Sequence, residues 1–131
     1  MPLKVNWEGV FPAIPTQFKE DLSIDIEATQ KHTEALVNNG IHGIVMLGTI
    51  REGTSLTLSE KVEVLRATVE VAGGKVPVLS GIAEFTTQGA CDTVKAAGEA
   101  GVDGIMLLPA MVYKSDARET IAHFLTVANS T

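Results

Sequence analysis

Apolar residues along the chain follow two spacings in turn. Short consecutive apolar runs, bounded by glycine, proline or polar residues, predict strands covered on both faces, because such strands lack polar alternation. Four of these runs occur, at residues 9–14, 43–47, 76–82 and 104–108. Apolar residues at helical spacing follow them, at residues 25–39, 59–72, 87–100 and 117–128. The pattern therefore predicts four successive strand and helix units.

Two of the predicted helices carry further signals. Gly73 and Gly74 follow the second helix and are interpreted as its C-terminal stop. Four apolar residues line one side of the last helix, and we expect this to be its packed side: Ile121, Phe124, Leu125 and Ala128.

The strand spacing points to a parallel sheet. Strand starts lie roughly 30 residues apart, the length of a strand plus a crossover helix. Periodicity alone leaves two architectures open, a doubly wound open sheet with helices on both faces and half of a closed barrel with helices on one side. A nucleotide-binding, flavodoxin-like domain would need a phosphate loop after the first strand. Residues 15–20 contain no glycine, which disfavours that class.

Composition narrows the class of partner. The chain has 131 residues, of which 45% are hydrophobic and 20% charged, as in globular proteins, and we treat residues 1–131 as one domain. The net charge is −6 and the ten Lys and Arg residues are scattered, so nucleic acid is not an expected partner. The first residues lack the apolar core of a signal peptide, and no apolar run could span a membrane. We therefore expect a cytoplasmic protein.

Few residues suggest metal or redox chemistry. Cys91 is the only cysteine, which excludes an intrachain disulfide, and we interpret it as a small packed thiol. His32, His42 and His123 do not fall at metal-ligand spacing with one another or with acidic residues. We expect neither a metal nor a cofactor.

Four segments together resemble a known family. Residues 43–53 read Gly-Ile-Val-Met-Leu-Gly-Thr-Ile-Arg-Glu-Gly, and Glu60 follows. This segment resembles the signature of the dihydrodipicolinate synthase and N-acetylneuraminate lyase family, and residues 9–18, 80–83 and 108–113 resemble the family's first, third and fourth strands. The resemblance covers nearly the whole chain in order. It implies a (β/α)4 unit, the N-terminal half of a (β/α)8 TIM barrel with parallel strands and helices on the outside.

The loop after the second predicted strand is the candidate substrate site. Gly48 and Thr49 end a strand, where backbone N–H groups and a hydroxyl can hold a carboxylate. By resemblance, Thr49 hydrogen-bonds the carboxylate of a pyruvate or 2-keto acid bound as a Schiff base. Ile50 replaces the second threonine of a proton relay, so it offers only its backbone N–H. Arg51 stands where the family has a glycine, and three interpretations stay open: a solvated loop charge, an engineered or adapted change, or a contact with the substrate. Glu52 resembles the family's structural carboxylate.

A candidate catalytic tyrosine follows the fourth predicted strand. A phenol in this place can act as a general acid or base, and by resemblance Tyr113 passes protons to and from the substrate. Counting back from His123 and Phe124 without gaps puts Val112 on the tyrosine position instead. A rim aromatic with a solvated hydroxyl is therefore the alternative for Tyr113. We interpret Lys114 as a solvated loop lysine.

The resemblance implies a lyase or synthase that acts on pyruvate or another 2-keto acid through a lysine Schiff base. The family's imine lysine lies on the sixth strand, beyond the four units, so we expect this stretch to be inactive alone. A half-barrel also has two unpaired strand edges and an apolar inner face. We therefore expect self-association into a homodimer. The alternative function is a non-catalytic half-barrel scaffold that self-associates into a barrel-like dimer.

Overall fold

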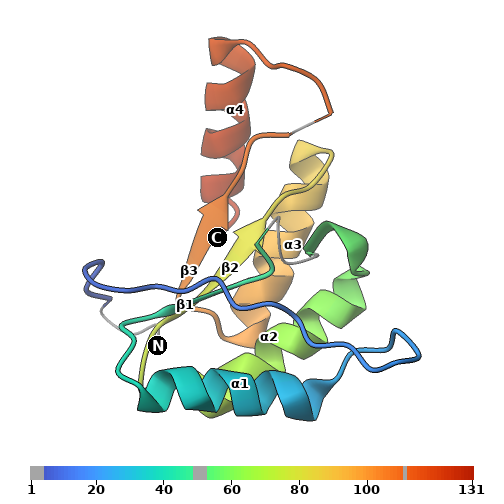
Figure 1. Ribbon diagram of the computed structural model, residues 1–131. Coiled ribbons are helices and arrows are strands. Elements are labelled where there is room, and N and C mark those ends of the chain that lie inside the picture. The colour runs from blue at the N-terminus through green and yellow to red at the C-terminus, as the bar shows by residue number, and fades with distance from the viewer. Residues whose placement is uncertain (1–4, 49–52, 111) are drawn as a thin grey trace.

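The computed structural model describes residues 5–48, 53–110 and 112–131 (Figure 1). Strands and helices alternate along these ranges. They are α1 (Ile26–Asn38), β1 (Ile44–Met46), the short 3-10 helix η2 (Gly53–Ser55), α2 (Leu58–Ala72), β2 (Val78–Ile82), α3 (Thr87–Ala100), β3 (Gly104–Leu107) and α4 (Ala117–Ala128). All strand pairs are parallel and the sheet order is β1-β2-β3. Parallel strands alternating with helices form half of a TIM barrel, as predicted.

Helix boundaries follow from local capping. A side-chain oxygen of the preceding residue accepts a backbone N–H of the first turn in each α-helix; these capping residues are Asp25, Thr57, Thr86 and Asp116. Gly73 caps the C-terminus of α2 and Gly74 has a φ of +79°, so the predicted stop is confirmed. The bounds of α3 and α4 are those predicted from the sequence.

The core lies between the sheet and the helices. The side chains of Ile44, Met46, Val78 and Ile82 are completely buried. The helices pack in sequence, α1 on α2, α2 on α3 and α3 on α4, as in the outer ring of a barrel (Figure 1). Cys91 on α3 is buried in this layer, as the packed-thiol interpretation requires.

The prediction of a strand at residues 9–14 is wrong. Among residues 9–14, called here the N-terminal segment, only Ala13 forms a parallel bridge, to Val45. The Ile14 N–H donates to the Val45 carbonyl, and the Val45 N–H donates to the Pro12 carbonyl, both at 3.0 Å. The next rung would need an N–H on Pro12, which proline lacks. The segment therefore runs beside β1 without forming a regular strand.

The packed side of α4 also differs from the prediction. The helix buries His123 and Val127, whereas Ile121 and Leu125 on the predicted packed side are exposed, Leu125 to 60%. On the buried side of α4, the His123 ring is hydrogen-bonded to the Thr87 hydroxyl at 2.9 Å and to the Leu108 carbonyl at 3.3 Å. Two polar partners allow histidine to take the buried position. The apolar stripe is left on the outside.

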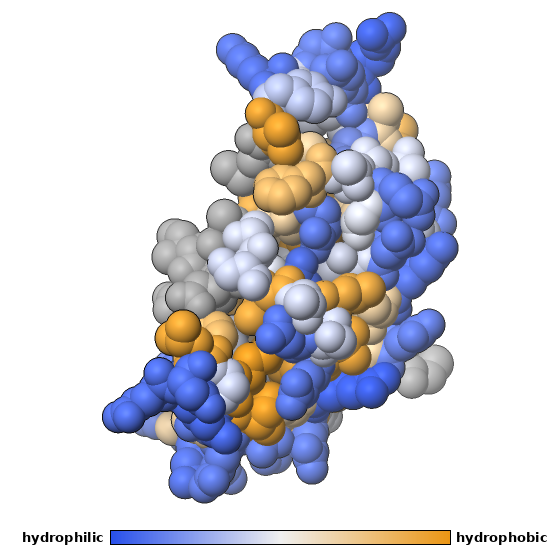
Figure 2. All heavy atoms as spheres, turned by 90° about the vertical axis from the view of Figure 1, so that its right-hand side faces the viewer, coloured by the Kyte–Doolittle hydropathy of each residue, from blue (hydrophilic) through white to orange (hydrophobic). Residues whose placement is uncertain are grey.

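The surface of the helical layer is partly apolar. Figure 2 shows apolar side chains gathered within a polar surround on one face of the molecule. A groove among α1, α2 and α3 is lined by Ile26, Leu58, Val62, Ala67 and Ala96 together with charged side chains. No described helix has the length and hydropathy needed to cross a membrane.

Candidate substrate-carboxylate site

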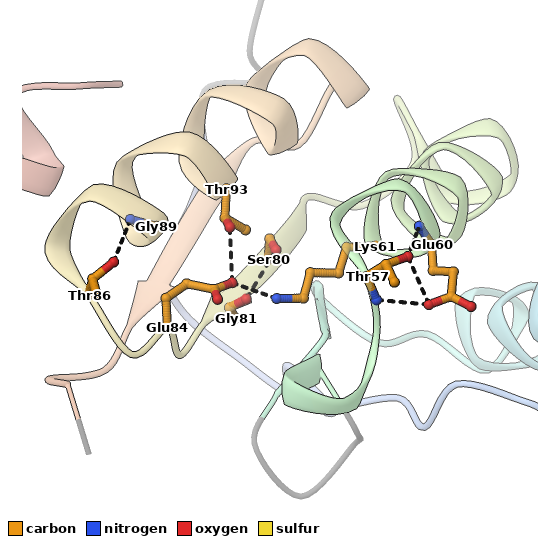
Figure 3. Close-up of polar contacts among 9 residues, drawn as sticks. All are labelled: Thr57, Glu60, Lys61, Ser80, Gly81, Glu84, Thr86, Gly89 and Thr93. Carbon is orange, nitrogen blue, oxygen red and sulfur yellow. Dashed lines mark hydrogen bonds and ion pairs between the residues drawn. The ribbon is translucent and has the colours of Figure 1, made fainter. Parts of the chain in front are cut away.

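The carboxyl ends of the three strands meet at one edge of the sheet. β1 leads there into Leu47 and Gly48, and β2 leads into Glu84. Active sites of barrel proteins are built from the loops at this edge. Figure 3 shows the polar residues that surround it, from α2, from β2 and the loop after it, and from α3.

Leu47 turns the chain at the end of β1 in an unusual conformation. Its φ is +56°, in the left-handed region that costs a non-glycine residue about 1–2 kcal/mol. Such a conformation persists only where the surroundings hold it. Two glycines do so, because a Cβ on Gly53 would overlap the Leu47 carbonyl oxygen, and one on Gly81 would lie 2.6 Å from the same atom. The backbone of Leu47 is thus wedged between Gly53 and Gly81.

This wedge places Gly48 at the carboxyl edge. Gly48 is buried, and a Cβ on Gly81 would lie 3.0 Å from its Cα atom. Thr49 and Ile50, the other two predicted substrate-binding residues, lie outside the described residues, as do Arg51 and Glu52. The described geometry therefore fixes where the candidate carboxylate loop begins.

Tyr113 lies in the loop between β3 and α4 and is 61% exposed. Val112, the alternative occupant of the tyrosine position, is also exposed, and so is Lys114. The loop follows a strand of the same parallel sheet as β1, so Tyr113 and Gly48 belong to the same edge. The choice between a catalytic and a rim tyrosine stays a prediction.

Glu60, the acidic residue that follows the signature, has a structural role. Its carboxylate accepts the Thr57 N–H at 2.8 Å and the Thr57 hydroxyl at 2.9 Å, while the Thr57 side chain accepts the Glu60 N–H (Figure 3). The two residues form a capping box at the start of α2. These hydrogen bonds, first the backbone N–H and then the hydroxyl, lower the pKa of Glu60.

A largely buried ion pair, not predicted from the sequence, lies beside this edge. The Lys61 ammonium on α2 lies 2.5 Å from Glu84 Oε1, and the Thr93 hydroxyl on α3 donates to the same oxygen at 2.9 Å (Figure 3). The side chains of Lys61 and Glu84 are only 9% and 21% exposed. A signal was available, since Lys61 precedes Val64 and Leu65 at helical spacing and so falls on the buried side of α2.

No described residues form a metal centre. Within 5–48, 53–110 and 112–131, no three His, Cys, Asp or Glu side chains are grouped so that they could hold a metal ion.

A parallel sheet with outer helices and a glycine-wedged turn at its carboxyl edge places the protein among the (β/α) barrel class, of which it shows half. The model of the dihydrodipicolinate synthetase family matches residues 6–131. The chain belongs to that family.

Curated relatives agree with this assignment. The chain is 38% identical to the 4-hydroxy-tetrahydrodipicolinate synthase of Methanoculleus marisnigri over 94% of its length, and 40% identical to that of Staphylococcus carnosus over 95%. It covers 43% and 42% of these two proteins. The chain thus spans less than half the length of the curated relatives it matches.

Solved structures show the same half-barrel within larger chains. The dihydrodipicolinate synthase DapA-2 of Bacillus anthracis superposes with a TM-score of 0.90 at 34% identity, over 97% of this chain and 44% of that one. YagE of Escherichia coli K12, solved in complex with pyruvate, gives 0.90 at 26% identity, over 95% of this chain and 42% of that one. The N-acetylneuraminate lyase of Mycoplasma synoviae, at 23% identity and 0.87, shares the fold; the match covers 95% of this chain and 44% of that one.

Proposed function

We propose that the loop beginning at Gly48 binds the carboxylate of pyruvate or another 2-keto acid, as part of a lyase or synthase that acts through a lysine Schiff base. One observation carries the proposal: Leu47 is held in the left-handed region between Gly53 and Gly81, at the carboxyl edge of the sheet. Strained backbone held by its surroundings is concentrated at ligand sites. Family membership and the pyruvate complex of YagE support the substrate class.

A buried hydroxyl adds support at the same edge. Thr16 Oγ1 is buried and has no hydrogen-bond partner in the described part of the chain. Thr16 lies three residues beyond Ala13, as Gly48 lies three residues beyond Val45, the bridge partner of Ala13. Buried hydroxyls are normally paired, so a ligand oxygen could complete this one.

Within the proposed reaction, each residue has a distinct role. Thr49 donates its hydroxyl to the substrate carboxylate, and Gly48 and Ile50 contribute backbone groups of the same loop. Tyr113 transfers protons to and from the bound keto acid. We expect the imine lysine to come from a later strand of the barrel, outside the described residues, so this stretch should bind keto acids without forming the imine.

The test is a titration of the labelled chain with pyruvate, followed by nuclear magnetic resonance. We expect pyruvate to shift the amide signals of Gly48 and its loop, and acetone, which lacks the carboxylate, to leave them unchanged. Borohydride reduction with pyruvate should leave the protein mass unaltered. Equal responses to pyruvate and acetone, or none at all, would contradict the carboxylate site. A pyruvyl adduct on a lysine would contradict the assignment of the imine lysine elsewhere.

A second candidate function is a scaffold that self-associates into a homodimer. Two observations favour it: α4 has an exposed apolar stripe, which includes Ile121, Phe124 and Leu125, and β3 is the last strand of the described sheet, paired only with β2 among the described strands. Exposed apolar surface beside an unpaired strand edge favours association. Light scattering after size exclusion should give twice the chain mass, and Leu125→Glu should shift it to the single chain. A wild-type mass equal to one chain would sink this candidate.

A further inference from the structure

Lys61, Glu84 and Thr93 form a largely buried network, called here the Lys61 network. Its members come from three places, α2, the loop after β2, and α3. Glu84 Oε1 accepts hydrogen bonds from the Lys61 ammonium, at 2.5 Å, and from the Thr93 hydroxyl, at 2.9 Å. The network therefore joins α2 and α3 through the loop between β2 and α3 (Figure 3).

Stability alone is a weak explanation for this network. Removing a lysine and a glutamate from water costs free energy that their attraction often fails to recover, so well-packed apolar residues commonly stabilise such positions as well or better. Lys61 lies on the side of α2 that also buries Val64 and Leu65. An apolar residue would suit that side. The ion pair differs from apolar packing because it fixes the Lys61 ammonium of α2 against one carboxylate oxygen of the loop, Glu84 Oε1.

The two residues of the ion pair are connected along the chain to the two glycines beside Leu47. Gly53 opens η2, and the capping box at Thr57 then fixes the start of α2, which carries Lys61. Gly81 lies in β2, three residues before Glu84. Gly53 and Gly81 are the glycines whose backbones close on the Leu47 carbonyl. The Lys61 to Glu84 contact thus links the segments that carry these two glycines.

We infer that the Lys61 network positions the carboxylate loop: by tying α2 to the end of β2, it keeps Gly53 and Gly81 pressed on Leu47 and so presents Gly48 at the edge of the sheet. Lys61 and Glu84 are positioning residues in this role, and neither needs to touch the substrate. The inference rests on the proposed function, since it assigns the loop's ligand as a keto acid.

The test compares Glu84→Gln with wild type by amide spectra and pyruvate titration. Glutamine keeps an oxygen for Thr93 but loses the charge that attracts Lys61. We expect the amide signals of Gly48, Gly53 and Gly81 to move, signals from α4 to stay, and the pyruvate dissociation constant to rise ~10-fold, as expected for a displaced binding group. Lys61→Arg should recover most of the affinity that Lys61→Met loses, and either lysine variant serves if Glu84→Gln does not fold.

The control is Glu27→Gln, which removes an exposed ion pair with Lys31 on α1, 2.6 Å long. It should change neither the three glycine signals nor pyruvate affinity. A Glu84→Gln protein that unfolds more easily, yet keeps wild-type glycine signals and affinity, would overturn the positioning role. If wild type itself does not bind pyruvate, the proposed function fails, while the glycine signals still decide whether the network positions the loop.

Discussion

Replacing Gly81 with alanine should lower the free energy of unfolding by about 1–3 kcal/mol, the range of an overpacked core position. The added Cβ would lie 2.6 Å from the Leu47 carbonyl oxygen and 3.0 Å from the Cα of Gly48. Both obstacles are backbone atoms, so no side chain can rotate away. Either β2 or the turn after β1 must shift, and pyruvate binding at Gly48 should be lost. Urea denaturation and the same titration measure the two effects.

Gly98→Ala provides the matched control. Gly98 lies inside α3, and a Cβ there would meet no atom within 4 Å. Alanine is favoured over glycine in helix interiors, so this variant should gain about 0.5–1 kcal/mol. Equal stability changes in the two variants would mean that the contact between Gly81 and Leu47 is not as tight as described.

Leu65→Ala should cost about 3 kcal/mol, which makes it one of the largest core effects in the chain. Leu65 is 1% exposed and belongs to the main apolar cluster, packed between α2 and the sheet. Truncation removes buried methyl groups and leaves a cavity that the surrounding strands cannot fill. Thermal or urea unfolding monitored by circular dichroism gives the value.

Leu58→Ala, on the same helix, separates burial from residue type. Leu58 is 44% exposed at the start of α2. Because much of its side chain already meets water, its truncation should cost under about 1 kcal/mol. A cost for Leu58 that equals the cost for Leu65 would show that α2 is rotated from the orientation described.

The sequence was sufficient to predict most of the architecture. Strong helical periodicity located α3 and α4 correctly. The apolar run at residues 76–82 was recognisable as a buried strand, which the structure places at Val78–Ile82. Apolar runs could not reveal that Pro12 removes a rung of the ladder, because proline is itself compatible with an extended segment. The N-terminal segment therefore looked like a strand.

Polar residues in buried positions account for the wrong side predicted for α4 and for contacts that hydropathy could not indicate. α1 buries Thr29 and Thr33, whose hydroxyls donate to the carbonyls of Asp25 and Thr29 one turn earlier, at 2.8 and 2.9 Å. The buried side of α4 is likewise set by His123, which hydropathy reads as polar. Burial of such residues depends on partners that a hydropathy pattern does not contain. Lys61, at the candidate site, is likewise a buried polar residue whose position depends on its partner, Glu84.

The site itself was only partly predictable. Gly48 could be placed at the end of a strand from the pattern, and the roles of Thr49 and Tyr113 came from resemblance. The left-handed Leu47 and its contacts with Gly53 and Gly81 had no sequence signal, because each glycine read alone is compatible with an ordinary turn. Close approach between segments far apart in the chain becomes visible only in three dimensions.

The single bridge of the N-terminal segment makes the sheet uneven in its resistance to local opening. β2 is hydrogen-bonded to a neighbour on each side, whereas the N-terminal segment forms a single bridge to β1, at Ala13, and a further backbone hydrogen bond from the His42 N–H to the Val10 carbonyl. Local unfolding starts where the backbone hydrogen bonds are fewest. Amide protection should therefore decline from β2 outward. Gly81, which packs against the Leu47 carbonyl, belongs to β2, so we expect this contact to persist when the N-terminal segment opens locally.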